Sequence, residues 1–244
     1  MYKRSSVHVV LHTCSASSSL KRITATVYSR FSLSLPAGSN TPELQHMNTE
    51  QEPVTAHFRK HLEKFIAIDA SEFTAILSFF EVKHYRKKED LLTEGQVCKW
   101  HFFVLEGCLR KFFVNEKGVE QTTEFAIENW WITDNMAYEH RQATEFTIQA
   151  VEASAVLVID SAAQEQLLLE HPKMERYFRF IYQRAYGAWQ MRIKWLYSMS
   201  GEAFYHHFYD SHPEFVQRVP QYLLASFLGI TPEYLSEIRN KKRS

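Results

Sequence analysis

RVPQYLLASFLGITPEYLSEIRNKK, residues 218–242, is the stretch from which the rest of the chain is interpreted. It predicts two short helices joined by a tight turn. Pro220 suits the first position of the first helix, where its missing N–H costs nothing. Gly229 follows that helix, where a left-handed turn residue is needed. The apolar face between them consists of Tyr222, Leu223, Leu224, Phe227 and Leu228.

The second helix of this stretch has a well-marked start and a basic end. Thr231 is a natural N-cap, Pro232 suits the first helical position, and Glu233 adds negative charge to the first turn. The end is basic, with Arg239, Lys241, Lys242 and Arg243. Together these features predict a DNA-binding helix-turn-helix. An ordinary helical hairpin that closes a domain would look similar, and this alternative stays open.

A long helix is expected before this region, from Pro172 to Ser198. At about 1.5 Å per residue it spans roughly 40 Å. Small residues recur among large apolar ones at three- and four-residue steps, which suits a seam between two copies of the chain. Packing against its own β domain is the alternative, and the helix can do both. The candidate seam residues are Tyr177, Ile181, Ala185, Ala188 and Trp195.

Between residues 82 and 159 the pattern changes to short β-branched and aromatic runs separated by polar turns. Many short strands at regular spacing predict a closed or double-sheet β architecture. Helices are expected at Val54–Ile66, after the N-cap Asp69, and from Ser161, with Gln164 as its capping-box partner. The expected strands lie near 82–86, 90–92, 100–106, 108–115, 119–126, 144–151 and 154–159.

Residues 1–46 differ from the rest in composition. They are rich in Ser and Thr and hold five basic residues against one acidic residue. We interpret them as an over-extended reading frame, or as a disordered or targeting segment, and exclude them from the fold. Residues 47–244 then carry 23 basic and 27 acidic residues, although the whole chain has a formal net charge of zero. A nucleic-acid site must therefore be local.

The remaining motifs exclude several classes of protein. Cys14, Cys98 and Cys108 lack metal-ligand spacing, and their odd number argues against a disulfide framework. No Gly-rich phosphate loop, nucleophile elbow or HExxH helix is present. Trp130 and Trp131 are assigned to core packing, with a pocket lining as the alternative. No apolar run reaches the roughly 18 residues of a membrane span. We expect a cytoplasmic protein that is not an enzyme, with no metal, no cofactor and no membrane partner.

A β-roll, then a long helix, then a helix-turn-helix: this order resembles the Crp/Fnr family of bacterial transcription regulators. The resemblance covers about residues 55–244 and is carried by LLTEGQVCKWHFFVLEGCLRKFF (91–113), NEKGVEQTTEFAIENWW (115–131) and the C-terminal stretch quoted above, which looks like the Bacteroidetes-type form. It implies an α+β fold. Residues 47–160 would form a cyclic-nucleotide-binding-like jelly roll (a double-stranded β-helix), 161–199 the linking and dimerisation helices, and 200–244 a small helix-turn-helix domain without a full wing.

The resemblance also places an effector pocket. Members that bind cyclic AMP hold its ribose with the Glu of a Gly-Glu pair, and its phosphate with an Arg-Ser pair about ten residues later. Those pairs fall on Thr133 and Asp134, and on Thr144 and Glu145. Glu145 would repel the phosphate. We therefore expect no tight cyclic AMP binding and an unknown small-molecule effector.

The implied function is that of a homodimeric transcription regulator that binds double-stranded DNA, with RNA polymerase as a further partner. Glu233 could accept a hydrogen bond from a cytosine amino group, whereas Lys241 and Lys242 would contact phosphates. The alternative is a ligand-binding or dimeric scaffold module whose helix-turn-helix does not bind DNA. Base readout would fall on Thr231, Glu233, Tyr234, Ser236, Arg239 and Asn240.

Overall fold

The structure is a computed structural model that describes residues 52–241 of the 244-residue chain. The interpretations of residues 1–46 and of Lys242 therefore lie outside the described residues. Two helices, α1 (Glu52–Leu62) and α2 (Ala70–Leu77), precede the strands. Asp69 caps α2 as predicted, because its carboxylate accepts a hydrogen bond from the Glu72 backbone N–H at 2.8 Å.

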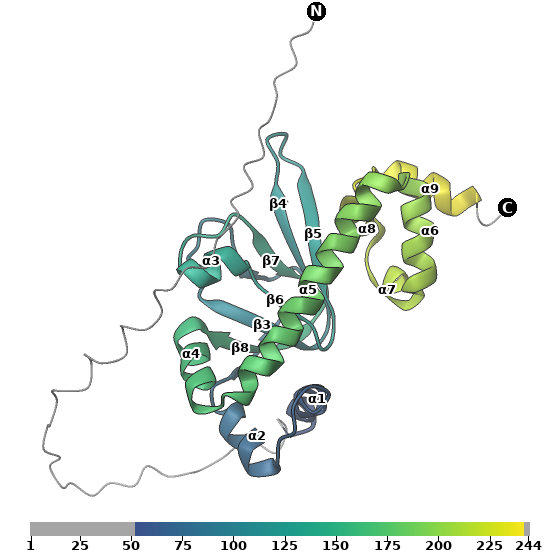
Figure 1. Ribbon diagram of the computed structural model, residues 1–244. Coiled ribbons are helices and arrows are strands. Elements are labelled where there is room, and N and C mark those ends of the chain that lie inside the picture. The colour runs from purple at the N-terminus through teal and green to yellow at the C-terminus, as the bar shows by residue number, and fades with distance from the viewer. Residues whose placement is uncertain (1–51, 242–244) are drawn as a thin grey trace, which may run out of the picture. The chain divides into compact units, whose positions relative to one another are not determined.

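The strands of the described chain form two four-stranded antiparallel sheets, drawn in shades from blue to green in Figure 1. The first sheet has the order β1 (Glu81–Tyr85), β8 (Ser154–Asp160), β3 (Trp100–Glu106) and β6 (Trp131–Ile132). The second has the order β2 (Asp90–Leu92), β7 (Thr147–Ala150), β4 (Leu109–Val114) and β5 (Glu120–Ala126). The predicted α+β fold with a β-roll is confirmed. Three short elements were not predicted: β6, the helix α3 (Asn135–His140) and, after the strands, the helix α7 (Pro213–Arg218).

The two central strands of the first sheet, β8 and β3, are covered on both faces, which explains why they are apolar almost throughout. Phe102 and Val104 of β3 point into the core between the two sheets, together with residues such as Leu109. The alternate residues Phe103 and Leu105 pack against the helices on the other face. That second core gathers side chains from several helices, namely Phe58, Leu62, Phe73, Ile76, Leu167, Met174, Tyr177 and Phe178.

Two helices follow the strands, α4 (Ser161–Glu170) and α5 (Lys173–Ser198). The cap of α4 is Asp160 and not Ser161 as expected, because the Asp160 carboxylate accepts hydrogen bonds from two backbone N–H groups of the first turn, at 2.8 and 2.9 Å. The first turns of α5 belong to the core of the roll. No described helix combines the length and the apolar character that a membrane span requires.

The chain continues through α6 (Gly201–Ser211), α7 (Pro213–Arg218), α8 (Gln221–Leu228) and α9 (Pro232–Lys241). The predicted turn is confirmed, with Gly229 in the left-handed conformation at φ +70°. Thr231 caps α9 as predicted, accepting a hydrogen bond from the Tyr234 backbone N–H at 3.2 Å. Two details differ. Pro220 precedes α8 instead of starting it, and Tyr222 is 50% exposed and does not belong to the apolar face.

Candidate functional site

The structure brings three of the four predicted effector residues together at the start of α3. The Thr144 hydroxyl donates to one carboxylate oxygen of Asp134 at 2.8 Å, and the other oxygen accepts from the Ala137 backbone N–H at 3.3 Å. The Thr133 hydroxyl donates to the Trp100 carbonyl at 2.9 Å. Glu145 is exposed. The polar groups of this site are therefore already engaged within the fold.

A buried cation, which sequence reasoning missed, lies in the same region. The Lys111 ammonium donates to the Thr133 carbonyl at 2.9 Å and pairs with Glu124 at 2.7 Å. Lys111 is buried, and its ammonium also lies 5.5 Å from the centre of the Phe146 ring. A buried ammonium needs such partners, because charge without compensation is costly in the interior. The positive charge of Lys111 is thus compensated by groups of the protein itself.

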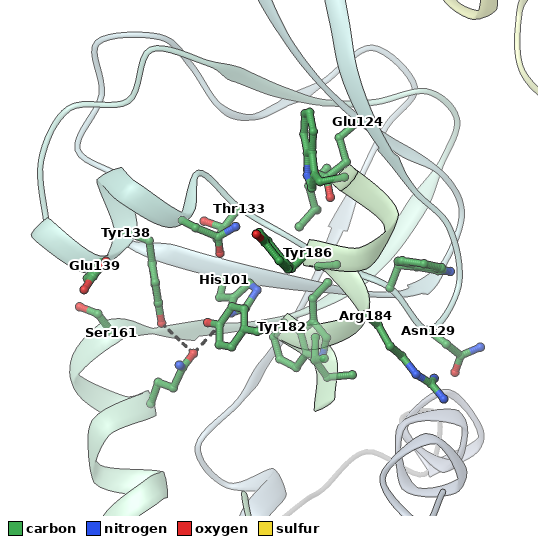
Figure 2. A pocket seen from close by; sticks show the side chains of 18 of the residues that line it. His101, Glu124, Asn129, Thr133, Tyr138, Glu139, Ser161, Tyr182, Arg184 and Tyr186 are labelled. Carbon is green, nitrogen blue, oxygen red and sulfur yellow. Dashed lines mark hydrogen bonds between the residues drawn. The ribbon is translucent and has the colours of Figure 1, made fainter. Parts of the chain in front are cut away.

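A cavity of about 820 Å³ opens beside these residues, between the roll and α5 (Figure 2). Of the four predicted effector residues only Thr133 lines it. Trp130 and Trp131 line it too, as the alternative interpretation expected. The core assignment is confirmed for Trp131, which is buried in the core, and not for Trp130, which is 45% exposed. The main additional lining residues are His61, Lys64, His101, Tyr138, Gln164, Tyr182, Arg184, Tyr186 and Trp189.

A buried polar network forms the floor of this cavity. Tyr138 and His101 both donate to the side-chain oxygen of Gln164, at 3.2 and 3.4 Å, as the dashed lines in Figure 2 show. Burial lowers the pKa of His101 to about 3, so its imidazole is neutral. Burial likewise raises the pKa of Tyr138. Neutral donors and acceptors suit recognition of a ligand by hydrogen bonds.

The second helix of the helix-turn-helix presents most of the predicted DNA-contacting residues to solvent. Arg239 is half-buried near the end of α9, and Lys242 lies outside the described residues. The buried residues of α9, Leu235 and Ile238, pack on α6 and α8 instead. The exposed predicted residues are Thr231, Glu233, Tyr234, Ser236, Asn240 and Lys241.

The first helix of the motif is held against the roll. The Ser226 hydroxyl on α8 accepts from the Thr122 backbone N–H and donates to the Glu120 carbonyl, both at 2.9 Å, on the edge strand β5. Arg218 forms ion pairs with Glu128 and Glu152. These contacts fix α7 and α8 on the roll, whereas one face of α9 stays exposed.

Helix α5 connects the cavity with the helix-turn-helix. Ala185 and Trp189 line both the large cavity and a second one of about 350 Å³, whose other walls include aromatic side chains of α6, α7 and α8. One turn further along, Arg192 donates to the Phe227 carbonyl at 2.8 Å and stacks on its ring. Helix α5 therefore lines both cavities and contacts α8 directly.

The predicted seam residues of α5 do not share one environment. Tyr177 is fully buried and accepts a hydrogen bond from the Trp131 indole at 2.7 Å, so the expectation that it faces a partner helix is wrong. Ile181 and Ala185 line the cavity, Trp195 packs against Phe204, and Ala188 is exposed. The exposed apolar face of the helix instead consists of Tyr182, Tyr186, Ile193, Leu196 and Tyr197.

Comparison with known proteins agrees with this architecture. Residues 82–171 match the family described as cyclic nucleotide-binding domain. The solved structures that resemble the chain include the c-di-GMP-responsive global regulator CLP of Xanthomonas campestris, with TM-score 0.59 and 15% identity over 72% of this chain and 92% of that one. A CooA mutant of Carboxydothermus hydrogenoformans has a TM-score of 0.56 and 19% identity, and the match covers 69% of this chain and 78% of that one. FixK2 of Bradyrhizobium japonicum has a TM-score of 0.56 and 14% identity, and the match covers 66% of this chain and 83% of that one. No curated protein matches the sequence.

These comparisons show the fold of the described chain. Residues 82–171 form a cyclic nucleotide-binding-type domain, and the described chain has the fold of the Crp/Fnr regulators. The resemblance recognised in the sequence is thus confirmed at the level of fold.

Sequence reasoning missed most of the cavity. Its walls come from α1, β3, β5, β6, α3, α4 and α5, elements that are distant in the chain and whose faces no short motif marks. The sequence features that indicated the cavity were the adjacent pair Trp130 and Trp131, and Thr133 of the expected effector pocket. Within the described residues, no group of three His, Cys, Asp or Glu side chains is arranged to hold a metal ion.

Proposed function

We propose that this protein is a dimeric, DNA-binding transcription regulator whose β-roll domain senses a small molecule other than cyclic AMP. The observation that carries the proposal is the helix-turn-helix itself, whose capped second helix is exposed while its first helix is anchored on the roll. Its exposed surface offers both base-reading and phosphate-binding side chains, which is the division of roles that DNA readout needs.

The mechanism we propose is a shift between two arrangements of the dimer. Helix α5 borders the cavity and holds α8 through Arg192. A ligand that binds one position of α5 better than another would favour one spacing of the two recognition helices. Only a spacing near one helical turn of DNA, about 34 Å, lets both enter successive major grooves.

Selection of bound sequences from a random DNA duplex pool tests this function. The full chain at low salt should enrich a two-fold symmetric motif, and Arg239→Ala should weaken the enrichment, because the guanidinium lies on the DNA-facing helix. Arg179→Ala, an exposed change on α5, is the matched control and should leave the motif unchanged. Cyclic AMP should not increase enrichment, because the Asp134 carboxylate is already hydrogen-bonded within the protein.

The scaffold function is favoured by one observation, the exposure of Glu233 and Glu237 on the same helix. Two carboxylates reduce the attraction of α9 to phosphates. A chain that is dimeric by sedimentation but enriches no motif, with or without the aromatic acids considered below, would support the scaffold and overturn the regulator.

A further inference from the structure

The cavity beside α5 contains a buried histidine without a hydrogen-bonding partner. His61 of α1 is 5% exposed, and neither ring nitrogen has a hydrogen-bond partner within the described chain. Its ring packs between Phe65 and Phe103, at centroid distances of 5.3 and 5.2 Å. Buried polar side chains are nearly always hydrogen-bonded, because an unpaired one carries the full cost of leaving water. An unpaired imidazole on a cavity wall therefore indicates a ligand group.

Two cations stand at the same part of the cavity. Lys64, in the turn after α1, and Arg184 of α5 line it, and neither has an ion pair or a side-chain hydrogen bond within residues 52–241. The Arg184 guanidinium lies over the Phe65 ring, 4.7 Å from its centre. Burial, and then the positive charges of Lys64 and Arg184, lower the pKa of His61 to about 4. The neutral imidazole can donate one hydrogen bond, and the cations can supply the charge.

The carboxylates of the cavity lie elsewhere on its lining. Glu124 belongs to β5, Glu139 to α3 and Glu165 to α4, whereas the cations come from the α1 turn and α5. Figure 2 shows Arg184 and Glu139 on opposite sides of the cavity. This segregation directs an anionic group to His61 and away from the rest of the lining.

Aromatic and apolar side chains form much of the remaining wall. Trp131 comes from β6, and Tyr182, Tyr186 and Trp189 come from successive turns of α5. Flat rings of this kind favour a planar apolar ligand. The volume of about 820 Å³ is within the range of small-molecule sites.

We propose that this cavity binds a small aromatic carboxylic acid, with its carboxylate at His61, Lys64 and Arg184 and its ring against Trp131 and α5. The inference rests on the proposed function only in treating this ligand as the effector. Binding itself can be measured without DNA.

Isothermal titration calorimetry with the full chain tests the proposal. The probes are benzoate, indole-3-acetate and 2-naphthoate, each compared with its neutral amide, which has nearly the same shape. At least one acid should bind about tenfold or more tightly than its amide, because a charge-assisted hydrogen bond contributes about that factor. His61→Phe and Arg184→Gln should each remove this preference.

The controls separate the site from general effects. Arg179→Gln changes an exposed cation of the same helix that does not line the cavity, and it should keep the preference. Arg184 is exposed, so its variant should fold even if His61→Phe does not. No binding of any acid, or equal binding of acid and amide, would overturn the proposal. If the DNA selection succeeds and no acid binds, the ligand proposal is wrong and the regulator function is kept. If an acid binds with the expected preference and no DNA motif is enriched, the ligand site is kept and the regulator function is wrong.

Discussion

Gly107, between β3 and β4, occupies a backbone conformation that other residues rarely adopt. Its φ is +104°, and a Cβ there would lie 2.2 Å from the Ser154 hydroxyl and 2.8 Å from the Ala153 carbonyl oxygen. We expect Gly107→Ala to lower the free energy of unfolding by roughly 2 kcal/mol or more, measured by urea denaturation. Gly118→Ala is the control, since its φ of +74° is also positive but no atom lies within 4 Å. An equal decrease in the free energy of unfolding in both variants would show that the close approach of Ser154 and Ala153 to Gly107 does not contribute.

His101 makes the stability of the roll dependent on pH. Its pKa of about 3 in the folded state lies below the ordinary value of 6.5, so the unfolded state binds the extra proton between these pH values. The free energy of unfolding should therefore fall as the pH decreases from about 6.5 towards 3. His101→Gln should reduce this slope by up to about 1.4 kcal/mol per pH unit, the contribution of one proton. Urea unfolding at pH 7, 6 and 5 measures the slope, and an unchanged slope would contradict the assignment.

Single residues whose role depends on near neighbours were predictable from the sequence. The caps Asp69 and Thr231 are in place because capping involves a backbone N–H three residues away. Ser161 failed as a cap because the adjacent Asp160 offers a carboxylate that accepts two such bonds. The environments of His61 and His101 were not predictable, because their neighbours come from distant parts of the chain.

At the scale of elements, the contact between α8 and β5 includes two hydrogen bonds made by one hydroxyl, that of Ser226. Ser226→Ala removes both bonds to β5 and leaves the Thr122 N–H without its acceptor. We expect the Thr122 amide to exchange its hydrogen about tenfold faster or more, because local opening of the edge strand becomes easier. Hydrogen exchange followed by mass spectrometry measures this. The exposed Ser236→Ala on α9 should leave the exchange unchanged, and identical rates in both variants would show that the hydroxyl does not hold β5.

Long elements were predictable from periodicity, and short ones were not. The strand pattern gave the double-sheet roll, and the 26-residue α5 was expected with nearly the same bounds. The missed elements are β6 with two residues, and α3 and α7 with six each, which are too short to show a period. The face of a helix also escaped prediction where several packing surfaces compete, as Tyr177 shows by entering the core.

At the scale of the whole molecule, α5 serves three surfaces with different parts of its length. Its first turns complete the core of the roll, its middle lines the cavity, and Arg192 and Trp195 contact the C-terminal helices. The sequence shows only one amphipathic helix. It does not show this division, because the groups that each part of α5 contacts come from other elements of the chain. The division leaves one apolar face of α5 exposed within residues 52–241.

That uncovered face predicts how two copies associate. Tyr182, Tyr186 and Ile193 follow the spacing of one helix face, and Ile193 is 48% exposed. We expect sedimentation equilibrium to show a dimer that Ile193→Glu converts to a monomer, because a carboxylate would be buried in the seam. Met191 is 41% exposed and only two residues away, so it lies on the opposite face, and Met191→Glu should leave the dimer intact. The monomeric variant should also lose two-fold symmetric DNA motifs. Dimers of equal stability in both variants would instead place the interface on another surface.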